Sequence, residues 1–306
     1  MIYTVTLNPA IDVSLHVRDG LMPGKINRSY GMRTDPGGKG INVSKTLRVL
    51  GMDSVVCTCV CGEDGRKLAE MLSNEFELLS VNCPSGNTRT NIKITGADGV
   101  TTDINGDGPA YDKDTVESLK ALLSGRLASG DVVVISGSPP SGSPAGIYAD
   151  LIKSFGAVEG VRVILDCSGT YLREGLEAHP YAVKPNCSEL GIGVDPEAAM
   201  NEALDIVSGG VSRCLVSMGS AGAVFADSER EKFYSKAVEV DVKCTTGCGD
   251  AMTAGLAYAL EKGMSSEETF RFCMALASAK AGTDGTAPPP KELVFELFKG
   301  IPFCGQ

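Results

Sequence analysis

Short, almost continuous apolar runs alternate along the chain with longer amphipathic segments. The runs cover residues 2–7, 55–60, 132–136, 161–166, 182–184 and 214–217. Strands buried on both faces of a parallel sheet have this pattern. The helical period of 3.6 appears in 64–72, 115–123, 144–155, 196–207, 251–262, 266–280 and a segment ending at Leu50. This repeated order predicts an α/β fold with a mostly parallel central sheet covered by helices.

Two regions interrupt the alternation, at residues 12–34 and 87–104. Both contain short alternating strands separated by turns, without a helical period. We expect them to join into a small β-sheet inserted in the core, which acts as a lid and excludes water from a site. The whole chain, 1–306, is then a single domain.

Composition narrows the classes of function. The chain has 306 residues, 43% of them hydrophobic, which supports a large core, and a net charge of −10, which argues against a nucleic-acid partner. No uncharged apolar stretch reaches the length of a membrane span, and the N-terminus does not resemble a signal peptide. The 11 cysteines predict reduced thiols in a cytoplasm rather than a disulfide framework. Cys57, Cys59 and Cys61 share a strand face, and buried core residues explain them better than a metal site does.

The most informative segment is Gly247-Cys248-Gly249-Asp250, which opens a predicted helix. Two glycines let backbone N–H groups approach an anion, and the positive end of the helix reinforces them. A carboxylate beside a bound phosphate suits phosphoryl transfer to a hydroxyl, because one part holds the charge and the other accepts the proton. The alternative interpretation is an ordinary glycine turn with Asp250 as a helix cap.

A second candidate anion site lies in Gly37-Gly38-Lys39-Gly40, at the start of the helix that ends at Leu50. Lys39 adds a positive charge, and Asn42 lies one turn further along the helix, where it can bind a hydroxyl. The spacing is not that of a P-loop, and a glycine-rich connector with a solvated lysine remains the alternative. In an open α/β sheet, both glycine segments can face one crevice at the carboxyl ends of the strands.

Six motifs in the same order make the chain resemble the PfkB/ribokinase family of sugar kinases. They are Thr6-Leu7-Asn8-Pro9-Ala10-Ile11-Asp12, Gly37-Gly38-Lys39-Gly40, Thr88-Arg89-Thr90-Asn91, Lys184-Pro185-Asn186-Cys187-Ser188-Glu189-Leu190, Val216-Ser217-Met218-Gly219-Ser220-Ala221-Gly222 and Gly247-Cys248-Gly249-Asp250. The first and third motifs are most similar to the branch that contains 1-phosphofructokinases and tagatose-6-phosphate kinases. The resemblance implies a ribokinase-like three-layer α/β/α fold with a small β-sheet lid.

The resemblance also implies a role for each matching residue. Asp250 is expected to be the general base, with the backbone of Gly247, Cys248 and Gly249 holding the migrating phosphoryl group. The sugar phosphate is expected at Asp12, Gly37, Gly38, Lys39, Asn42 and Arg89. ATP is expected at Lys184, Asn186, Glu189, Ser217, Gly219, Ser220 and Gly222. Asn186 and Glu189 are further expected to position Mg²⁺ through water, although a capping box explains the same spacing.

Two residues depart from the family pattern. Cys248 stands where Ala or Ser is usual, and a thiol at a helix N-terminus is expected to have a lowered pKa, which would make it sensitive to oxidation. Pro139 stands where the branch commonly has Leu.

The expected activity is ATP-dependent phosphorylation of a ketohexose monophosphate, foremost fructose 1-phosphate to fructose 1,6-bisphosphate. The alternatives are tagatose 6-phosphate or another sugar as acceptor, and a non-catalytic sugar-phosphate sensor. A nicotinamide-dependent dehydrogenase is excluded because Asn8-Pro9 follows the first strand in place of a glycine fingerprint. The resemblance further implies a homodimer that forms through the lid.

Overall fold

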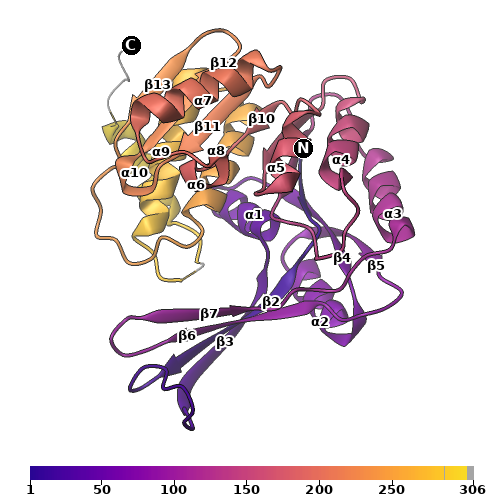
Figure 1. Ribbon diagram of the computed structural model, residues 1–306, viewed down its shortest axis with the longest axis vertical. Helices are drawn as coiled ribbons and strands as arrows, with labels where there is room; N and C mark the ends of the chain where they lie inside the picture. Colours follow the sequence, from indigo (N-terminus) through magenta and orange to yellow (C-terminus); the bar gives the residue numbers. More distant parts are fainter. Residues whose placement is uncertain (286, 302–306) are drawn as a thin grey trace.

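The computed structural model describes residues 1–285 and 287–301, which form a layered body from which a small sheet extends (Figure 1). The body is built on a nine-stranded sheet in the order β13-β12-β11-β10-β9-β8-β1-β4-β5. Its strands are β1 Ile2–Thr6, β4 Ser54–Val60, β5 Glu77–Asn82, β8 Val132–Ser136, β9 Arg162–Asp166, β10 Ala182–Val183, β11 Arg213–Ser217, β12 Ala223–Asp227 and β13 Lys232–Ser235. The strands from β11 to β5 pair in parallel, whereas β12 and β13 are antiparallel additions at one edge.

Helices cover both faces of this sheet, so the body has three layers. One face carries α1 Lys39–Val49, α2 Gly62–Ser73, α8 Cys248–Lys262 and α9 Ser266–Ala281, with α10 Lys291–Gly300 packed on α9. The other face carries α3 Lys113–Ser124, α4 Ile147–Gly156, α5 Thr170–Leu176 and α7 Pro196–Ser208. Successive residues of β8 enter opposite cores, since Val133 faces the second group of helices and Val134 the first. Burial on both faces is the reason that these strands are continuous apolar runs.

The predicted α/β order is confirmed, since each of the six apolar runs is a strand of the large sheet. The sequence pattern did not predict β5, β12, β13, α5 or α10. The strands β12 and β13 form an antiparallel hairpin after a short 3₁₀ turn, Gly219–Ala221, where no helix separates neighbouring strands. Alternation with helices, the signal used to find the other strands, is absent there.

The small sheet has four strands in the order β3-β2-β6-β7. They are β2 Ala10–Val17, β3 Ser29–Gly37, β6 Arg89–Thr95 and β7 Thr101–Asn105. The central pair, β2 and β6, is parallel, and both outer pairs are antiparallel. We refer to these four strands as the lid sheet. The strands β2 and β6 begin at the body, and β3 ends there (Figure 1). This arrangement places Asp12, Gly37 and Arg89 at the base of the sheet.

One pair of cysteines contradicts the expectation that all the thiols are free. Cys61 and Cys83 form a disulfide, with their Cα atoms 4.9 Å apart across a sequence separation of 22 residues. The reason is tertiary, because β4 and β5 are paired in parallel and each cysteine directly follows its strand. Cys57 and Cys59 lie fully buried in the core, as expected, and burial raises the pKa of Cys59 to about 12.

Among residues 1–285 and 287–301, no helix combines the length and the apolar character that crossing a bilayer requires.

Candidate active site

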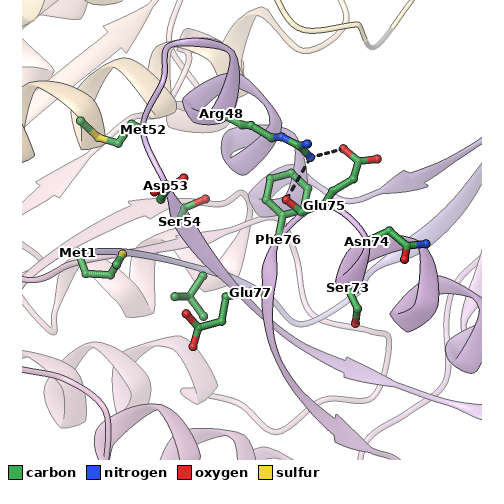
Figure 2. A pocket seen from close by; sticks show the side chains of 11 residues that line it. Met1, Arg48, Met52, Asp53, Ser54, Ser73, Asn74, Glu75, Phe76 and Glu77 are labelled. Carbon is green, nitrogen blue, oxygen red and sulfur yellow. Dashed lines mark hydrogen bonds and ion pairs between the residues drawn. The ribbon is translucent and has the colours of Figure 1, made fainter.

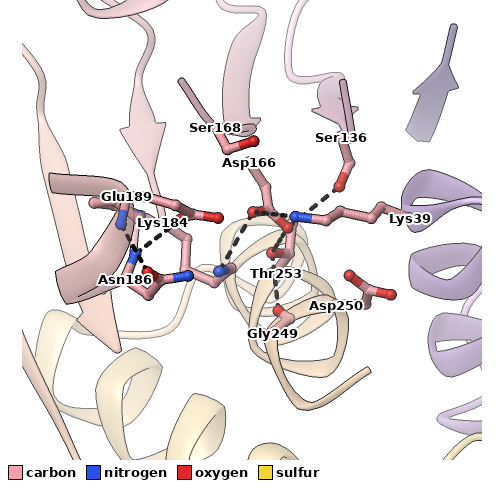
Figure 3. A network of polar contacts seen from close by, with 12 residues as sticks. Lys39, Ser136, Asp166, Ser168, Lys184, Asn186, Glu189, Gly249, Asp250 and Thr253 are labelled. Carbon is pink, nitrogen blue, oxygen red and sulfur yellow. Dashed lines mark hydrogen bonds and ion pairs between the residues drawn. The ribbon is translucent and has the colours of Figure 1, made fainter. Parts of the chain in front are cut away.

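The candidate site lies at the carboxyl ends of the central parallel strands, where the amino ends of α1 and α8 meet. Figure 3 shows Asp250, Lys39, Lys184 and Asp166 converging there from four different elements. The Nδ2 of Asn42 on α1 donates a hydrogen bond of 2.8 Å to the Oδ2 of Asp250 on α8, across 208 positions of sequence. The structure therefore brings the two glycine segments together, as the fold class predicts.

Glycine is needed at the start of α8 for a backbone reason. Gly247 has a φ of 85°, a region that side chains disfavour, and a Cβ there would come within 3.1 Å of the Cε of Lys280. No side chain of the described residues caps this helix. The amide of Cys248 donates to the carbonyl of Thr245 at 3.2 Å, so the first-turn amides of Gly249 and Asp250 are the part of the helix suited to binding an anion.

Sequence reasoning missed Asp166, which is the hub of the site. It ends β9 and is 1% exposed. Its Oδ1 lies 3.3 Å from the Nζ of Lys184 and 3.7 Å from the Nζ of Lys39. Its Oδ2 accepts hydrogen bonds from Ser136 at 3.2 Å and Thr253 at 2.9 Å. The one signal in the sequence for Asp166 is its position as a charged residue at the carboxyl end of an apolar run. Sites in open α/β sheets lie at that end of the strands.

The pKa values of the Asp250 and Asp166 carboxylates are shifted in opposite directions. Burial raises the pKa of Asp250 to about 6, and the negative charge of Asp166 acts in the same direction. Burial alone would also raise the pKa of Asp166, yet the ammonium groups of Lys184 and Lys39 hold it below its ordinary value. Asp166 in turn raises the pKa of Lys39. The site therefore contains one firmly ionised carboxylate and one that ionises close to neutral pH.

The residues at the base of the lid sheet are arranged around Asp12. Its Oδ1 accepts a hydrogen bond of 2.9 Å from the Nδ2 of Asn91 on β6. A Cβ at Gly37 would collide with the Asp12 carboxylate, so any larger residue there would displace this side chain. Gly38, the N-cap of α1, needs glycine for its backbone, because its φ is 130°.

Arg89 lies at the start of β6 beside a cavity of about 470 Å³, which borders the base of the lid sheet. Its terminal nitrogens donate to the carbonyls of Asn8 at 2.9 Å and Gly106 at 3.1 Å. Burial lowers the pKa of Arg89, and its Nε has no hydrogen-bond partner among the described residues. The hydrogen bonds of the guanidinium thus go to neutral oxygens, while its buried Nε–H stays unpaired; the charges of Asp12 and Asp107 act on it through space.

Asn186 and Glu189 form a capping box on α6 Cys187–Leu190. The Oδ1 of Asn186 accepts from the amide of Glu189, and the Oε2 of Glu189 accepts from the amide of Asn186, each at 2.9 Å. The structure therefore shows the alternative interpretation of this spacing, which leaves the second carboxylate oxygen of Glu189 outside the box. No group of three or more His, Cys, Asp or Glu side chains in residues 1–285 and 287–301 is arranged to hold a metal ion. One carboxylate oxygen fits a Mg²⁺ ion bound mainly by phosphates and water, and does not fit a protein-only cage.

The predicted nucleotide residues lie on the neighbouring strand. Ser217 ends β11 and forms an isolated bridge with Asn186. Gly219 and Ser220 belong to the 3₁₀ turn that follows, and Gly222 has a φ of 97° and packs directly on the backbone of Ser235 and Lys236. Because β11 pairs with β10, Ser217 and the turn after it lie beside Lys184, which directly follows β10.

The expectation of a reactive Cys248 thiol is wrong in its physical premise. Cys248 is the first residue of α8, but burial raises the pKa of its thiol above the ordinary value, and Lys280 only partly offsets that effect. Burial disfavours the thiolate more than the nearby cation favours it.

A second cavity, of about 440 Å³, lies at the opposite, amino ends of β1, β4 and β5 (Figure 2). Arg48 is held there by the carbonyl and carboxylate of Glu75 and stacks 5.5 Å from the ring centre of Phe76. None of the residues that line this cavity belongs to the predicted site.

Comparisons with known proteins agree with this architecture. A model of the pfkB family of carbohydrate kinases matches residues 6–292. The 1-phosphofructokinase of Bacillus subtilis (strain 168) is 34% identical over 306 residues, covering 97% of this chain and 98% of its own. Phosphofructokinase-2 from Escherichia coli, solved in complex with potassium and also with fructose-6-phosphate, is 28% identical, and the potassium complex has a TM-score of 0.91 with 98% of both chains covered. Ribokinase from Thermotoga maritima has a TM-score of 0.75 at 21% identity, covering 98% of this chain and 99% of its own, and so shows the ribokinase-like fold.

Proposed function

This chain belongs to the pfkB family of carbohydrate kinases, and we propose that it transfers the γ-phosphoryl group of ATP to fructose 1-phosphate with Asp250 as the general base. The observation that supports this most directly is the contact of Asn42 with Asp250, which joins the two glycine segments into one site. It places a helix amino end suited to a phosphoryl group next to a carboxylate suited to a hydroxyl proton.

The proposed chemistry uses Asp250 in its ionised form. With a pKa of about 6, the carboxylate is mostly ionised at pH 7 and above, yet it is a stronger base than an ordinary aspartate. It accepts the proton of the attacking hydroxyl, and the oxygen bonds to the γ-phosphorus as the bond to ADP breaks. The amides of the Gly247–Asp250 turn stabilise the negative charge of the phosphoryl group during transfer, those of Gly249 and Asp250 foremost, because the Cys248 amide donates to the Thr245 carbonyl.

The acceptor is proposed from the charges and open polar atoms around Asp12. Lys39, at the amino end of α1, and Arg89, at the base of the lid sheet, are positive groups that favour an already phosphorylated sugar. The Oδ1 atoms of Asn42 and Asn91 are buried and have no hydrogen-bond partner among the described residues, which leaves two acceptors for sugar hydroxyls. The Bacillus relative, named for fructose 1-phosphate chemistry, favours that ketohexose phosphate over tagatose 6-phosphate.

We assign the ATP side to the ends of β10 and β11. Lys184, Ser217, Gly219, Ser220 and Gly222 would line the nucleotide, with Asn186 placing Glu189 through the capping box. Bound Mg²⁺, held through water by Glu189, would neutralise charge on the donor phosphates.

We further propose that residues 1–306 act as one kinase domain, with the lid sheet covering the acceptor. Tyr30, Met32 and Ile104 are exposed apolar residues of the lid sheet, and a second copy pairing through this sheet would cover them. Eight of the ten described cysteines are free thiols and one pair forms a disulfide; with the use of ATP, we propose the cytoplasm as the place of action.

One assay tests the function. The purified enzyme is incubated with Mg-ATP and, separately, with fructose 1-phosphate, fructose 6-phosphate, tagatose 6-phosphate, fructose and ribose, and ADP release is measured. The highest kcat/KM is expected for fructose 1-phosphate. A preference for another phosphate reassigns the acceptor, and activity only on free sugars refutes the role of Lys39 and Arg89. Binding of fructose 1-phosphate without turnover of any of the five would favour the sensor.

A further inference from the structure

A buried lysine outside the predicted site lies directly behind the Gly247 turn. Lys280, in the last turn of α9, is 3% exposed. Its Nζ donates to the carbonyl of Gly285 at 2.8 Å and to the hydroxyl of Thr283 at 3.0 Å. Its Cε would lie 3.1 Å from a Cβ placed on Gly247. The side chain thus links the end of α9 to the start of α8.

The ammonium of Lys280 forms no ion pair with any described residue, and both of its hydrogen bonds go to neutral oxygens. The carboxylates of Asp250 and Asp284 act on it only through space, and they do not offset the cost of its burial. Burial accordingly lowers the pKa of Lys280. An unpaired buried charge is costly, and an anion that arrives beside it reduces that cost.

A lysine that only complements the dipole at the carboxyl end of a helix is usually exposed to solvent. Lys262, in the last turn of α8, is such a residue, and its side chain is exposed. Lys280 instead points inward and is packed on the turn whose amides are proposed to hold the migrating phosphoryl group. The chain leading to that turn is also fastened to α9, because the amides of Lys243 and Cys244 both donate to the carbonyl of Ala281.

We propose that Lys280 is a positioning residue for phosphoryl transfer, an internal cation that holds the Gly247–Asp250 turn in its anion-binding shape. The inference rests on the proposed function of this turn. Lys280 forms neither a hydrogen bond nor an ion pair with Asp250, although the two charges interact through space. It acts through Gly247 and through its positive charge behind the amides. When the donor phosphates bind, they supply the negative charge that the buried ammonium lacks.

The test compares Lys280→Met, which fills the space without charge, with Lys280→Ala, which leaves a space, and with Lys262→Met as the matched control. Because misplacement of a phosphoryl-binding turn costs about 10²-fold, we expect kcat to fall by about that factor in both Lys280 variants. The KM for the acceptor should stay within about twofold, since the acceptor residues do not touch Lys280. Lys262→Met should match the wild type.

Adding ethylammonium chloride to the assay distinguishes the effect of the lost Lys280 charge from the effect of lost packing. Lys280→Ala should regain about tenfold in kcat with ethylammonium, as an amine restores the missing ammonium, and tetramethylammonium chloride should give no rescue. Lys280→Met should not respond, because its side chain occupies the space; melting temperatures measured in parallel show that both variants are folded. Wild-type turnover in both Lys280 variants, or equal rescue of both, would refute the inference. A wild-type enzyme inactive on every acceptor would instead refute the proposed function.

Discussion

Replacing Asp250 with asparagine should make the protein more stable and almost inactive. The carboxylate is 8% exposed, and burial with the nearby charge of Asp166 raises its pKa to about 6 from an ordinary 3.8. A difference of that size corresponds to about 3 kcal/mol by which the folded protein disfavours the ionised form. Asparagine keeps an oxygen that accepts the hydrogen bond from Asn42 but has no charge to bury.

The sign of the pH dependence follows from the raised pKa. Below the unfolded value of 3.8, Asp250 is protonated in both states and costs nothing. Between pH 3.8 and about 6 the unfolded state has ionised this group while the folded state still holds the proton, so stability falls as the pH rises across that window. Above about pH 6 both states are ionised and the full cost applies. The stabilisation by Asp250→Asn should therefore be small near pH 4 and approach about 3 kcal/mol at pH 8.

Urea unfolding at pH 4.5, 6, 7 and 8 measures this difference, with the exposed Asp241→Asn as the matched control. In parallel, kcat of Asp250→Asn should fall by about 10³-fold, within the range expected for loss of a general base. A stability difference that is absent at pH 8, or that does not change with pH, would refute the account of charge burial. Near-normal turnover of Asp250→Asn would refute its role as the base.

Three further changes probe the rest of the site. In the wild type, log kcat/KM should fall with a slope of one as the pH drops below about 6, the pKa of Asp250. Asp166→Asn should move this acidic limb of the profile to lower pH. The substitution removes a negative charge that raises the pKa of Asp250, and it frees Lys39 and Lys184 to lower that pKa. A limb that stays in place or moves upward would contradict that network. Arg89→Lys should raise the KM for fructose 1-phosphate by about tenfold or more and leave the KM for ATP unchanged, because a lysine cannot reach both backbone carbonyls and a phosphate; equal changes in both constants would argue against an acceptor role. Cys248→Ala should keep kcat within about threefold, since its proposed contribution is its backbone. The wild type should resist iodoacetamide at pH 7, because the raised pKa keeps this half-buried thiol protonated. Rapid inactivation that Cys248→Ala abolishes would show that the thiol is reactive after all.

The local chemistry of the chain was sufficient to predict the central strands and the two glycine turns. Apolar runs such as Val132–Ser136 must be strands buried on both faces, and the turns at Gly38 and Gly247 need glycine whatever surrounds them. Such constraints act between residues close in sequence, so the pattern of residues carries them. The order of the elements then places Asn42 and Asp250 at the same end of one sheet.

Tertiary structure decided the charges and pairings. Asp166 becomes the hub only because Lys39 and Lys184 reach it from other elements, and Cys61 meets Cys83 only because β4 pairs with β5. The thiol of Cys248 and the ammonium of Lys280 differ from ordinary side chains through burial, which depends on everything packed around them. Backbone preference is a local property, whereas pKa, burial and ion pairing depend on distances that only the complete fold establishes.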